Sequence, residues 1–145
     1  MTDLKNLKLG VALCGSFCTF KQAVLMIENL VNLGIDVYPI MSFNAYNITT
    51  RFGKAEDFIA QIETLTGKPI IHTIVGAEPL GPKNLIDAML VAPCTGNTLS
   101  KIANAIVDTP VVLAANATMI SITLYSILSN QIKLYYTYLP SILFC

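Results

Sequence analysis

The sequence predicts an α/β fold built on a doubly wound parallel β-sheet. Two observations predict it. Short apolar runs, typical of strands that are covered on both faces, alternate with amphipathic stretches of helical spacing. The stretch 88–115 shows the pattern once in full: a buried strand, a polar turn with one glycine, a helix and a second buried strand. Strand–helix–strand crossovers are right-handed, so this alternation favours parallel strands.

The first half of the chain supplies one complete strand–helix–strand unit. A strand is expected over 7–13, followed by a helix over 20–33 whose apolar residues share one face. Gly34 is a natural C-terminal stop for this helix. The second strand is expected over 36–41. Pro39 within it lacks an N–H group, which argues for a position near an edge of the sheet or at a bulge.

The second half continues the alternation. A helix over 54–65 is followed by Thr-Gly-Lys-Pro, and 76–83 contains enough glycine and proline to be an irregular loop. The remaining expected elements are a strand over 70–75 that contains His72, a strand over 88–92, a helix over 99–107 and a strand over 111–115.

Composition indicates a single domain, with 54% hydrophobic and only 12% charged residues among 145. Such a chain suits a sheet buried under helices, with apolar surface left for a homo- or hetero-oligomeric partner. Nine basic residues balance nine acidic ones without a basic cluster, so nucleic-acid binding has no electrostatic support. The cysteines form no CxxC pair and His72 is the only histidine, so no metal site is expected. The polar start at 1–8 is no secretory signal, which makes a cytoplasmic location the default.

Three polar loops follow successive strands, at 14–19, 42–50 and 93–98. In a parallel sheet they open at one edge and can converge on a single ligand. Serine, threonine, asparagine and glycine predominate in them, and such loops bind phosphate through backbone N–H groups and hydroxyls. Each loop could instead merely cap its helix, with Ser16, Thr19 and Thr98 as N-caps. Capping does not require a shared edge, so a ligand is favoured for the three together. With Gly15 alone, the first loop lacks GxGxxG and suits a mononucleotide such as FMN.

Five further side chains have competing interpretations. His72 could be a general base or orient a flavin ring edge, or be a strand-end histidine with a backbone partner. Arg51 could hold a carboxylate substrate bidentately, although a surface arginine is the commoner case. Cys14 is best read as a small apolar filler, and Cys18, near a helix N-terminus, as a thiol that could be more reactive. Glu78 is expected to be solvated.

Four segments together resemble the family of dipicolinate synthase B subunits, over about 4–119. They are CGSFCTF, VYPIMSFNAYNITTRFG, AEPLGPK and APCTGNTLSKIANAIVDTPVVLAANATM. The wider superfamily of flavin-dependent cysteine decarboxylases and prenyl-flavin enzymes shares the GS turn, a serine after the second strand and an AP-x-[ST]-x-N-T loop. The resemblance implies a flavoprotein-type, Rossmann-like three-layer sandwich over 1–119.

The resemblance also implies an FMN site drawn from the three loops. Its residues are Gly15, Ser16, Ser42, Thr95, Asn97 and Thr98. His72 falls near the catalytic histidine of the decarboxylases, although the stretch from it to Ala92-Pro93 is longer here. AANATM replaces the proline- and methionine-rich substrate clamp of the decarboxylases, which counts against decarboxylation.

The implied activity is formation of dipicolinate, the calcium chelator of bacterial endospores, from 2,3-dihydrodipicolinate or its acyclic precursor. The implied partner is the nicotinamide-binding A subunit of dipicolinate synthase, so that NAD(P) enters with the partner. The implied location is the mother cell of a spore former. Two alternatives remain open: a stand-alone FMN-dependent decarboxylase, and a non-catalytic assembly subunit with a vestigial nucleotide pocket.

The segment 120–145 differs from the rest of the chain. From Ser121 it contains no acidic residue and no glycine, and Lys133 is its only basic residue. Polar residues at 129–131 and Lys133 interrupt the apolar run, which argues against a membrane span. Members of the family continue with a strand, a glycine-containing turn and a helix that this segment does not match. The expectation is therefore an atypical tail, produced by a frameshift or truncation.

Overall fold

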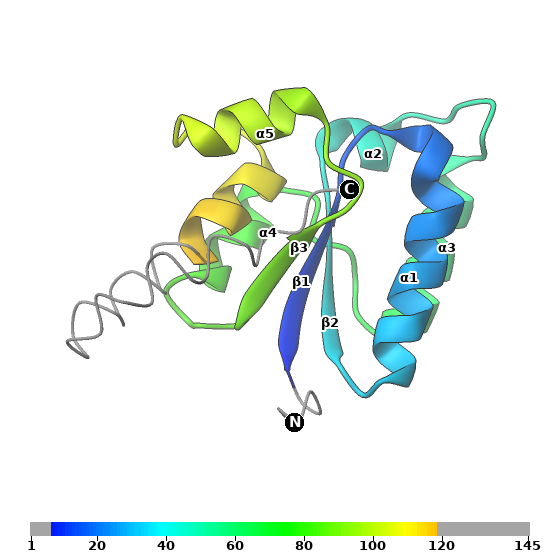
Figure 1. The fold of residues 1–145 in the computed structure, drawn as a ribbon, viewed down its shortest axis with the longest axis horizontal. Helices are drawn as coiled ribbons and strands as arrows, with labels where there is room; N and C mark the ends of the chain where they lie inside the picture. Colours follow the sequence, from blue (N-terminus) through cyan, green and yellow to red (C-terminus); the bar gives the residue numbers. More distant parts are fainter. Residues whose placement is uncertain (1–6, 119–145) are drawn as a thin grey trace.

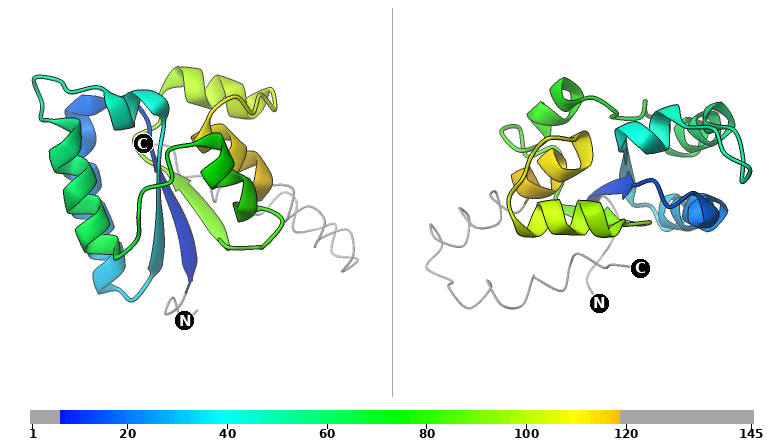
Figure 2. Two further views of the ribbon diagram at one scale, coloured as in Figure 1. Left: turned by 180° about the vertical axis from the view of Figure 1, so that it is seen from behind. Right: turned by 90° about the horizontal axis from the view of Figure 1, so that it is seen from above.

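A computed structural model describes residues 7–118. Within them, three parallel strands form one sheet: β1 (Lys8–Leu13), β2 (Asp36–Met41) and β3 (Ala88–Val91), in the order β2-β1-β3. α1 (Phe20–Asn32) and α3 (Ala55–Thr66) cover one face of the sheet. α4 (Ile74–Ala77), α5 (Gly96–Ala103) and a helix over 110–118 lie on the other side (Figures 1 and 2). The predicted doubly wound α/β sandwich is confirmed.

The central strand β1 divides its side chains between two apolar clusters because successive residues of a strand point to opposite faces. Val11 and Leu13 face α1 and α3, whereas Ala12 and Cys14 join the cluster beneath α5 and helix 110–118. β1 itself presents only small residues to this second face. At Gly10, on that face, an added Cβ would lie 2.9 Å from Cδ1 of Ile86.

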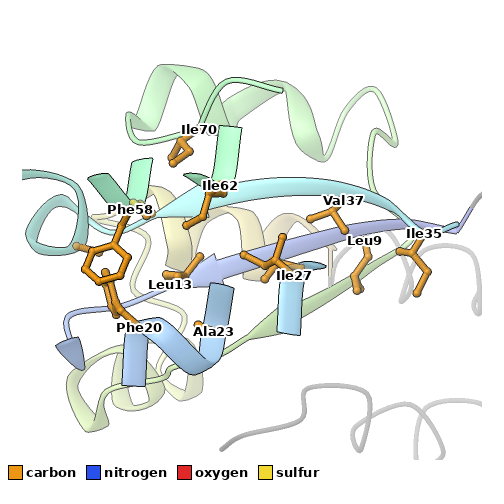
Figure 3. Close-up of a cluster of buried hydrophobic side chains, with 13 residues drawn as sticks. Leu9, Leu13, Phe20, Ala23, Ile27, Ile35, Val37, Phe58, Ile62 and Ile70 are labelled. Atoms are coloured by element: carbon orange, nitrogen blue, oxygen red, sulfur yellow. The ribbon is translucent and has the colours of Figure 1, made fainter. Parts of the chain in front are cut away.

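The cluster under α1 and α3 is organised around aromatic rings. Phe20 of α1 is 1% exposed, and its ring meets the Phe58 ring of α3 edge-on, with 5.3 Å between centroids. Figure 3 shows these two rings facing each other between the helices, with Ile27 and Ile62 further along the same layer. Gly67 ends α3 with φ of 66°, a left-handed conformation that glycine adopts without steric cost.

Pro39 lies in an edge strand of the described sheet, as predicted. The outward-facing groups of β2 meet a single residue, Ile71, whose N–H donates to the Pro39 carbonyl and whose carbonyl accepts from the Met41 N–H, both at 2.9 Å. The ring nitrogen of Pro39 therefore stands where an N–H group would point toward the edge, and no hydrogen bond to β1 is lost.

The predicted strand over 70–75 is wrong, because only Ile71 forms a bridge to β2. The backbone N–H and carbonyl of Ile70, the residue before this bridge, are bound by side chains and not by a strand. The Ile70 N–H donates to Oε1 of Glu63 at 2.9 Å, and the Ile70 carbonyl lies 3.1 Å from Nδ1 of His72. Thr73 then caps α4, accepting from the Gly76 N–H, so the chain turns away from the sheet.

The predicted strand over 111–115 is also wrong, because this stretch lies within helix 110–118. Oγ1 of Thr109 accepts from the Val112 N–H at 3.4 Å, and Pro110 occupies the first turn, where its missing N–H costs nothing. The helix packs closely on the loop before β3. An added Cβ at Gly81 would lie 2.9 Å from Cβ of Ala117.

Other differences concern boundaries. The helix expected over 99–107 is α5 and ends at Ala103, and the predicted loop 42–53 contains the short helix α2 (Phe43–Asn47). Single turns of 3₁₀-helix, η1 (Phe17–Thr19) and η2 (Glu78–Leu80), lie in the other loops. The segment 120–145 and its predicted origin lie outside the described residues. Within 7–118, every helix is too short or too polar to reach across a lipid bilayer.

Candidate functional site

The three polar loops meet at the carboxyl edge of the sheet, as predicted. The Cys14 N–H donates to the Pro93 carbonyl at 3.0 Å, which joins the first loop to the third. The Ser42 N–H donates to the Leu13 carbonyl at 3.0 Å, which joins the second loop to the end of β1. Cβ of Asn44 also lies 3.6 Å from the position of a Cβ added at Gly15. All three loops are therefore parts of one surface.

The third loop is held by a chain of hydroxyl groups. Oγ1 of Thr95 accepts from the Thr98 N–H at 3.3 Å, and the two hydroxyl oxygens lie 3.0 Å apart. The buried Thr98 hydroxyl donates to Sγ of Cys14 at 3.2 Å. The proton between the two threonine oxygens must therefore come from the Thr95 hydroxyl, which donates to Oγ1 of Thr98. Both hydroxyl protons are thus used within the protein, and Thr98 supports the loop from below.

The groups that this loop presents to a ligand are those of the first turn of α5. Helix geometry leaves the N–H groups of Gly96 and Asn97 without partners inside the helix, and both residues are exposed. The helix dipole adds a partial positive charge there. An anion is the ligand that such a turn favours.

The first two loops contribute one exposed turn and one capped helix. The Ser16 N–H donates to the Cys14 carbonyl at 2.8 Å, which closes a tight turn at Gly15 and leaves Ser16 half-buried at the surface. Oγ of Ser42 accepts from the Ala45 N–H at 3.2 Å. That bond uses an oxygen lone pair of Ser42 and leaves its proton for another acceptor.

Of the predicted N-caps, Ser16 and Thr19 occupy the N-cap positions and Thr98 does not. Ser16 and Thr19 precede η1 and α1 without a side-chain capping bond, and Thr98 is the third residue of α5. The side chains that do cap at this edge are Ser42 for α2 and Thr95 for α5. Capping therefore accounts for two of the six candidate FMN residues and leaves Ser16 and Asn97 unexplained by helix geometry.

His72 lies against α2, which belongs to the second of the three loops. Its ring stacks on Tyr46 with 3.7 Å between centroids and 5° between planes, and both residues are half-buried. Nδ1 of His72 bonds the Ile70 carbonyl, so the predicted backbone partner is present. The Tyr46 stack was missed by sequence reasoning. Its only signal was an aromatic residue one turn after Ser42.

Arg51 and Glu78 are both exposed. Arg51 lies in the turn closed by Thr50 and Gly53, between α2 and α3, with its guanidinium carbon 4.9 Å from the centroid of the Phe52 ring. The contact lies within the turn itself, and Arg51 as a whole is exposed to solvent. Glu78 opens η2, on the opposite side of the sheet from α1.

The thiols of the buried Cys14 and the half-buried Cys94 are poor nucleophiles. Burial raises the pKa of the Cys14 thiol, and the hydrogen bond from Thr98 offsets this only in part. Burial, with a smaller repulsion from Cys14, raises the pKa of Cys94 to about 11. Because the thiolate is the reactive form, both side chains act as apolar filler at neutral pH, as expected for Cys14.

This difference predicts a selective labelling pattern. Iodoacetamide at about neutral pH should modify the exposed Cys18 faster than the buried Cys14 and the half-buried Cys94, whose raised pKa keeps both thiols protonated. Peptide mapping by mass spectrometry measures this. The same reaction in guanidinium, where burial is lost, is the control and should label these three cysteines alike. Equal labelling of Cys94 and Cys18 in the folded protein would contradict the assignment.

A hollow lies between α2 and α3, beside the second loop. It measures about 430 Å³, and its lining includes Tyr46 and the carboxylates Glu56 and Glu63 without a lysine or arginine. A dicarboxylate is therefore a poor ligand for it. A smaller hollow of about 220 Å³ lies beside the β2 edge. Among residues 7–118 no three metal-ligating side chains gather.

A parallel sheet with helices on both faces and neutral polar loops at its carboxyl edge defines a Rossmann-like α/β protein. The comparison with protein families makes this specific. The chain belongs to the flavoprotein family, whose model matches residues 1–136.

Individual relatives narrow the similarity further. The chain is 48% identical over 119 residues to the B subunit of dipicolinate synthase from Bacillus subtilis (strain 168), covering 82% of this chain and 60% of the relative. A solved structure of the corresponding dipicolinate synthase chain from Bacillus halodurans C has a TM-score of 0.70 and 39% identity, over 81% of this chain and 60% of that one. The FMN-dependent cysteine decarboxylase SpaF, with a TM-score of 0.64 and 21% identity, covers 79% of this chain and 64% of its own, and shows the fold alone.

The resemblance to the family of dipicolinate synthase B subunits is thus confirmed. This chain nevertheless spans only about 60% of the length of these two relatives.

Proposed function

We propose that this chain acts as the B subunit of a dipicolinate synthase and binds FMN at the carboxyl edge of its sheet. The observation that carries the proposal is the joining of three neutral polar loops at that edge, through the Cys14–Pro93 and Ser42–Leu13 hydrogen bonds. The 48% identity to the B subunit from Bacillus subtilis supports the choice of enzyme.

The chemistry of the donors fits a flavin mononucleotide. The N–H groups of Gly96 and Asn97 and the hydroxyls of Ser16 and Ser42 are neutral donors, which suit a single phosphate held by hydrogen bonds. Thr95 and Thr98 shape the loop from which the N–H groups of Gly96 and Asn97 project. FMN bound there would supply a two-electron redox group.

In the proposed reaction a dicarboxylate, dihydrodipicolinate or its acyclic precursor, is oxidised to dipicolinate. The proposed partner is the nicotinamide-binding A subunit of the synthase, in the mother cell of a spore-forming bacterium. His72 is the proposed proton acceptor of this chain. Arg51, exposed beside Phe52, is free to reach a substrate carboxylate, which guanidinium groups bind bidentately.

Flavin binding tests the site directly. A visible absorption spectrum of the purified protein should show bound flavin, or FMN added to it should be bound stoichiometrically. The double variant Ser16→Ala, Asn97→Ala removes the Ser16 hydroxyl and the Asn97 side chain but keeps the backbone N–H at position 97. It should weaken binding about 10- to 100-fold, since one net hydrogen bond to a charged group is worth roughly 1.5–3 kcal/mol. Asn32→Ala, an exposed change at the far end of α1, is the matched control.

The enzyme assignment needs a second measurement, dipicolinate formation by this chain together with the nicotinamide-binding partner. Activity that requires both chains supports the proposal. A folded protein that binds no FMN would remove the cofactor from it, and turnover of a cysteine-containing peptide without a partner would favour the stand-alone decarboxylase instead.

A further inference from the structure

The ring pair formed by Tyr46 and His72 is held from both sides. Tyr46 belongs to α2, and its N–H donates to the Ser42 carbonyl at 3.0 Å. Ser42 is tied in turn to the end of β1 through its own N–H. The backbone from which the Tyr46 ring projects is therefore fixed with respect to the edge where the three loops meet.

The partner ring is fixed through Ile70. The Ile70 N–H is held by Oε1 of Glu63 at 2.9 Å, and the next residue, Ile71, forms the bridge to β2. The Ile70 carbonyl then meets Nδ1 of His72 at 3.1 Å. One hydrogen bond and one stacking contact, from two different elements, thus set the plane and the direction of the imidazole.

The same contact indicates which ring nitrogen carries the proton. A carbonyl oxygen only accepts, so Nδ1 of His72 must be the donor. In the neutral imidazole the lone pair then belongs to Nε2, on the opposite side of the ring. Free histidine prefers the other tautomer, with the proton on Nε2, so the protein inverts the usual preference.

We propose that Tyr46 is a positioning residue that holds His72 with its proton on Nδ1 and with Nε2 as the proton acceptor. This rests on the proposed function. Oxidation of the dihydro ring to the aromatic ring removes a hydride and a proton. The hydride passes to the oxidised nicotinamide cofactor of the partner, and the proton passes to Nε2 of His72, which becomes an imidazolium and later releases it to water.

The chain is well suited to a direct test because His72 is its only histidine. Protein labelled with ¹⁵N-histidine gives two ring nitrogen signals, whose shifts report which nitrogen is protonated. At about pH 8.5, where neutral imidazole dominates in ordinary histidines, the wild type should show a protonated Nδ1 and an unprotonated Nε2. Tyr46→Phe keeps the ring face and should preserve this pattern. Tyr46→Leu removes it and should shift the signals toward those of free histidine.

Glu63 provides a second, independent pair of variants. Glu63→Gln retains an acceptor for the Ile70 N–H and should leave the tautomer of His72 unchanged. Glu63→Ala removes that acceptor and should loosen the segment that orients the His72 ring. For dipicolinate formation with the nicotinamide-binding partner present, Tyr46→Leu should lower kcat by up to about 100-fold with little change in KM, and Tyr46→Phe should restore it. Circular dichroism and the denaturation midpoint identify any variant that has simply failed to fold.

The outcomes separate this inference from the function on which it rests. A wild-type spectrum with the proton on Nε2, or Tyr46→Leu spectra and kcat equal to the wild type, overturns the inference. The expected spectra together with no dipicolinate formation by the wild type would reject the proposed reaction and, with it, the assignment of Nε2 as its base. The expected spectra, together with a loss of kcat in Tyr46→Leu but not in Tyr46→Phe, support both the inference and the proposed reaction.

Discussion

Replacing Phe20 by alanine should destabilise the protein by about 3–5 kcal/mol, the usual cost of removing a buried phenyl ring. Phe20 is 1% exposed and packs on Phe17 and Phe58, with ring centroids 5.2 and 5.3 Å away. α1 and α3 meet around it, so neither helix can close the cavity without leaving the sheet. Urea denaturation should show a lower midpoint with an unchanged slope.

Leu25→Ala is the matched control for this prediction. Leu25 lies on the same helix but is 59% exposed, so its loss should change the free energy of unfolding by about 0.5 kcal/mol or less. Similar costs for the two variants would mean that the packing of α1 on α3 contributes little to stability. In that case the cluster in Figure 3 would not be the main core of the protein.

Replacing Asn97 by aspartate should abolish most FMN binding without loss of stability. A carboxylate on the first turn of α5 complements the helix dipole and is expected to stabilise the helix by about 0.3–1 kcal/mol. Toward a phosphate it is repulsive. A like charge about 6 Å away costs roughly 3 kcal/mol at an effective dielectric of about 20, so Kd for FMN should rise about 100-fold.

Ser100→Asp separates local repulsion from overall charge. It places the same charge on the same exposed helix, one turn further from the loops, and should affect FMN affinity much less. Titration of each variant with FMN, followed by flavin fluorescence, measures both constants. An unchanged Kd in Asn97→Asp would place the phosphate away from α5.

The convergence of the loops was predictable because it follows from strand direction alone. Once the runs at 7–13, 36–41 and 88–92 are interpreted as parallel strands, the polar residues after them must share an edge. The proline in β2 similarly indicated an edge strand. Neither inference needs to know how any side chain packs.

The helix over 110–118 could not be distinguished from a strand on its apolar run alone. The run Val-Val-Leu-Ala-Ala fits a buried strand or a buried helix equally well, since short apolar runs have no readable period. A signal was present just before it. Threonine followed by proline is an N-cap and first-turn pattern, and it favours the helix that the structure contains.

Details of the site depend on contacts that no local pattern encodes. The Thr98 hydroxyl finds Cys14 from 84 positions away, and Glu63 reaches Ile70 from the end of another helix. The Tyr46–His72 stack is of the same kind. Sequence could nominate these residue types but could not distinguish a ligand-binding hydroxyl from a supporting one.

The division of the core into two clusters has a consequence for how the chain acquires its structure during synthesis. Buried members of the first cluster all lie between Leu9 and Ile70, whereas those of the second extend to Ala115. Because synthesis begins at the N-terminus, all buried residues of the first cluster leave the ribosome before the second cluster is complete. Until helix 110–118 emerges, the second cluster lacks the four buried members that this helix contributes, so part of its apolar surface stays uncovered and open to a chaperone.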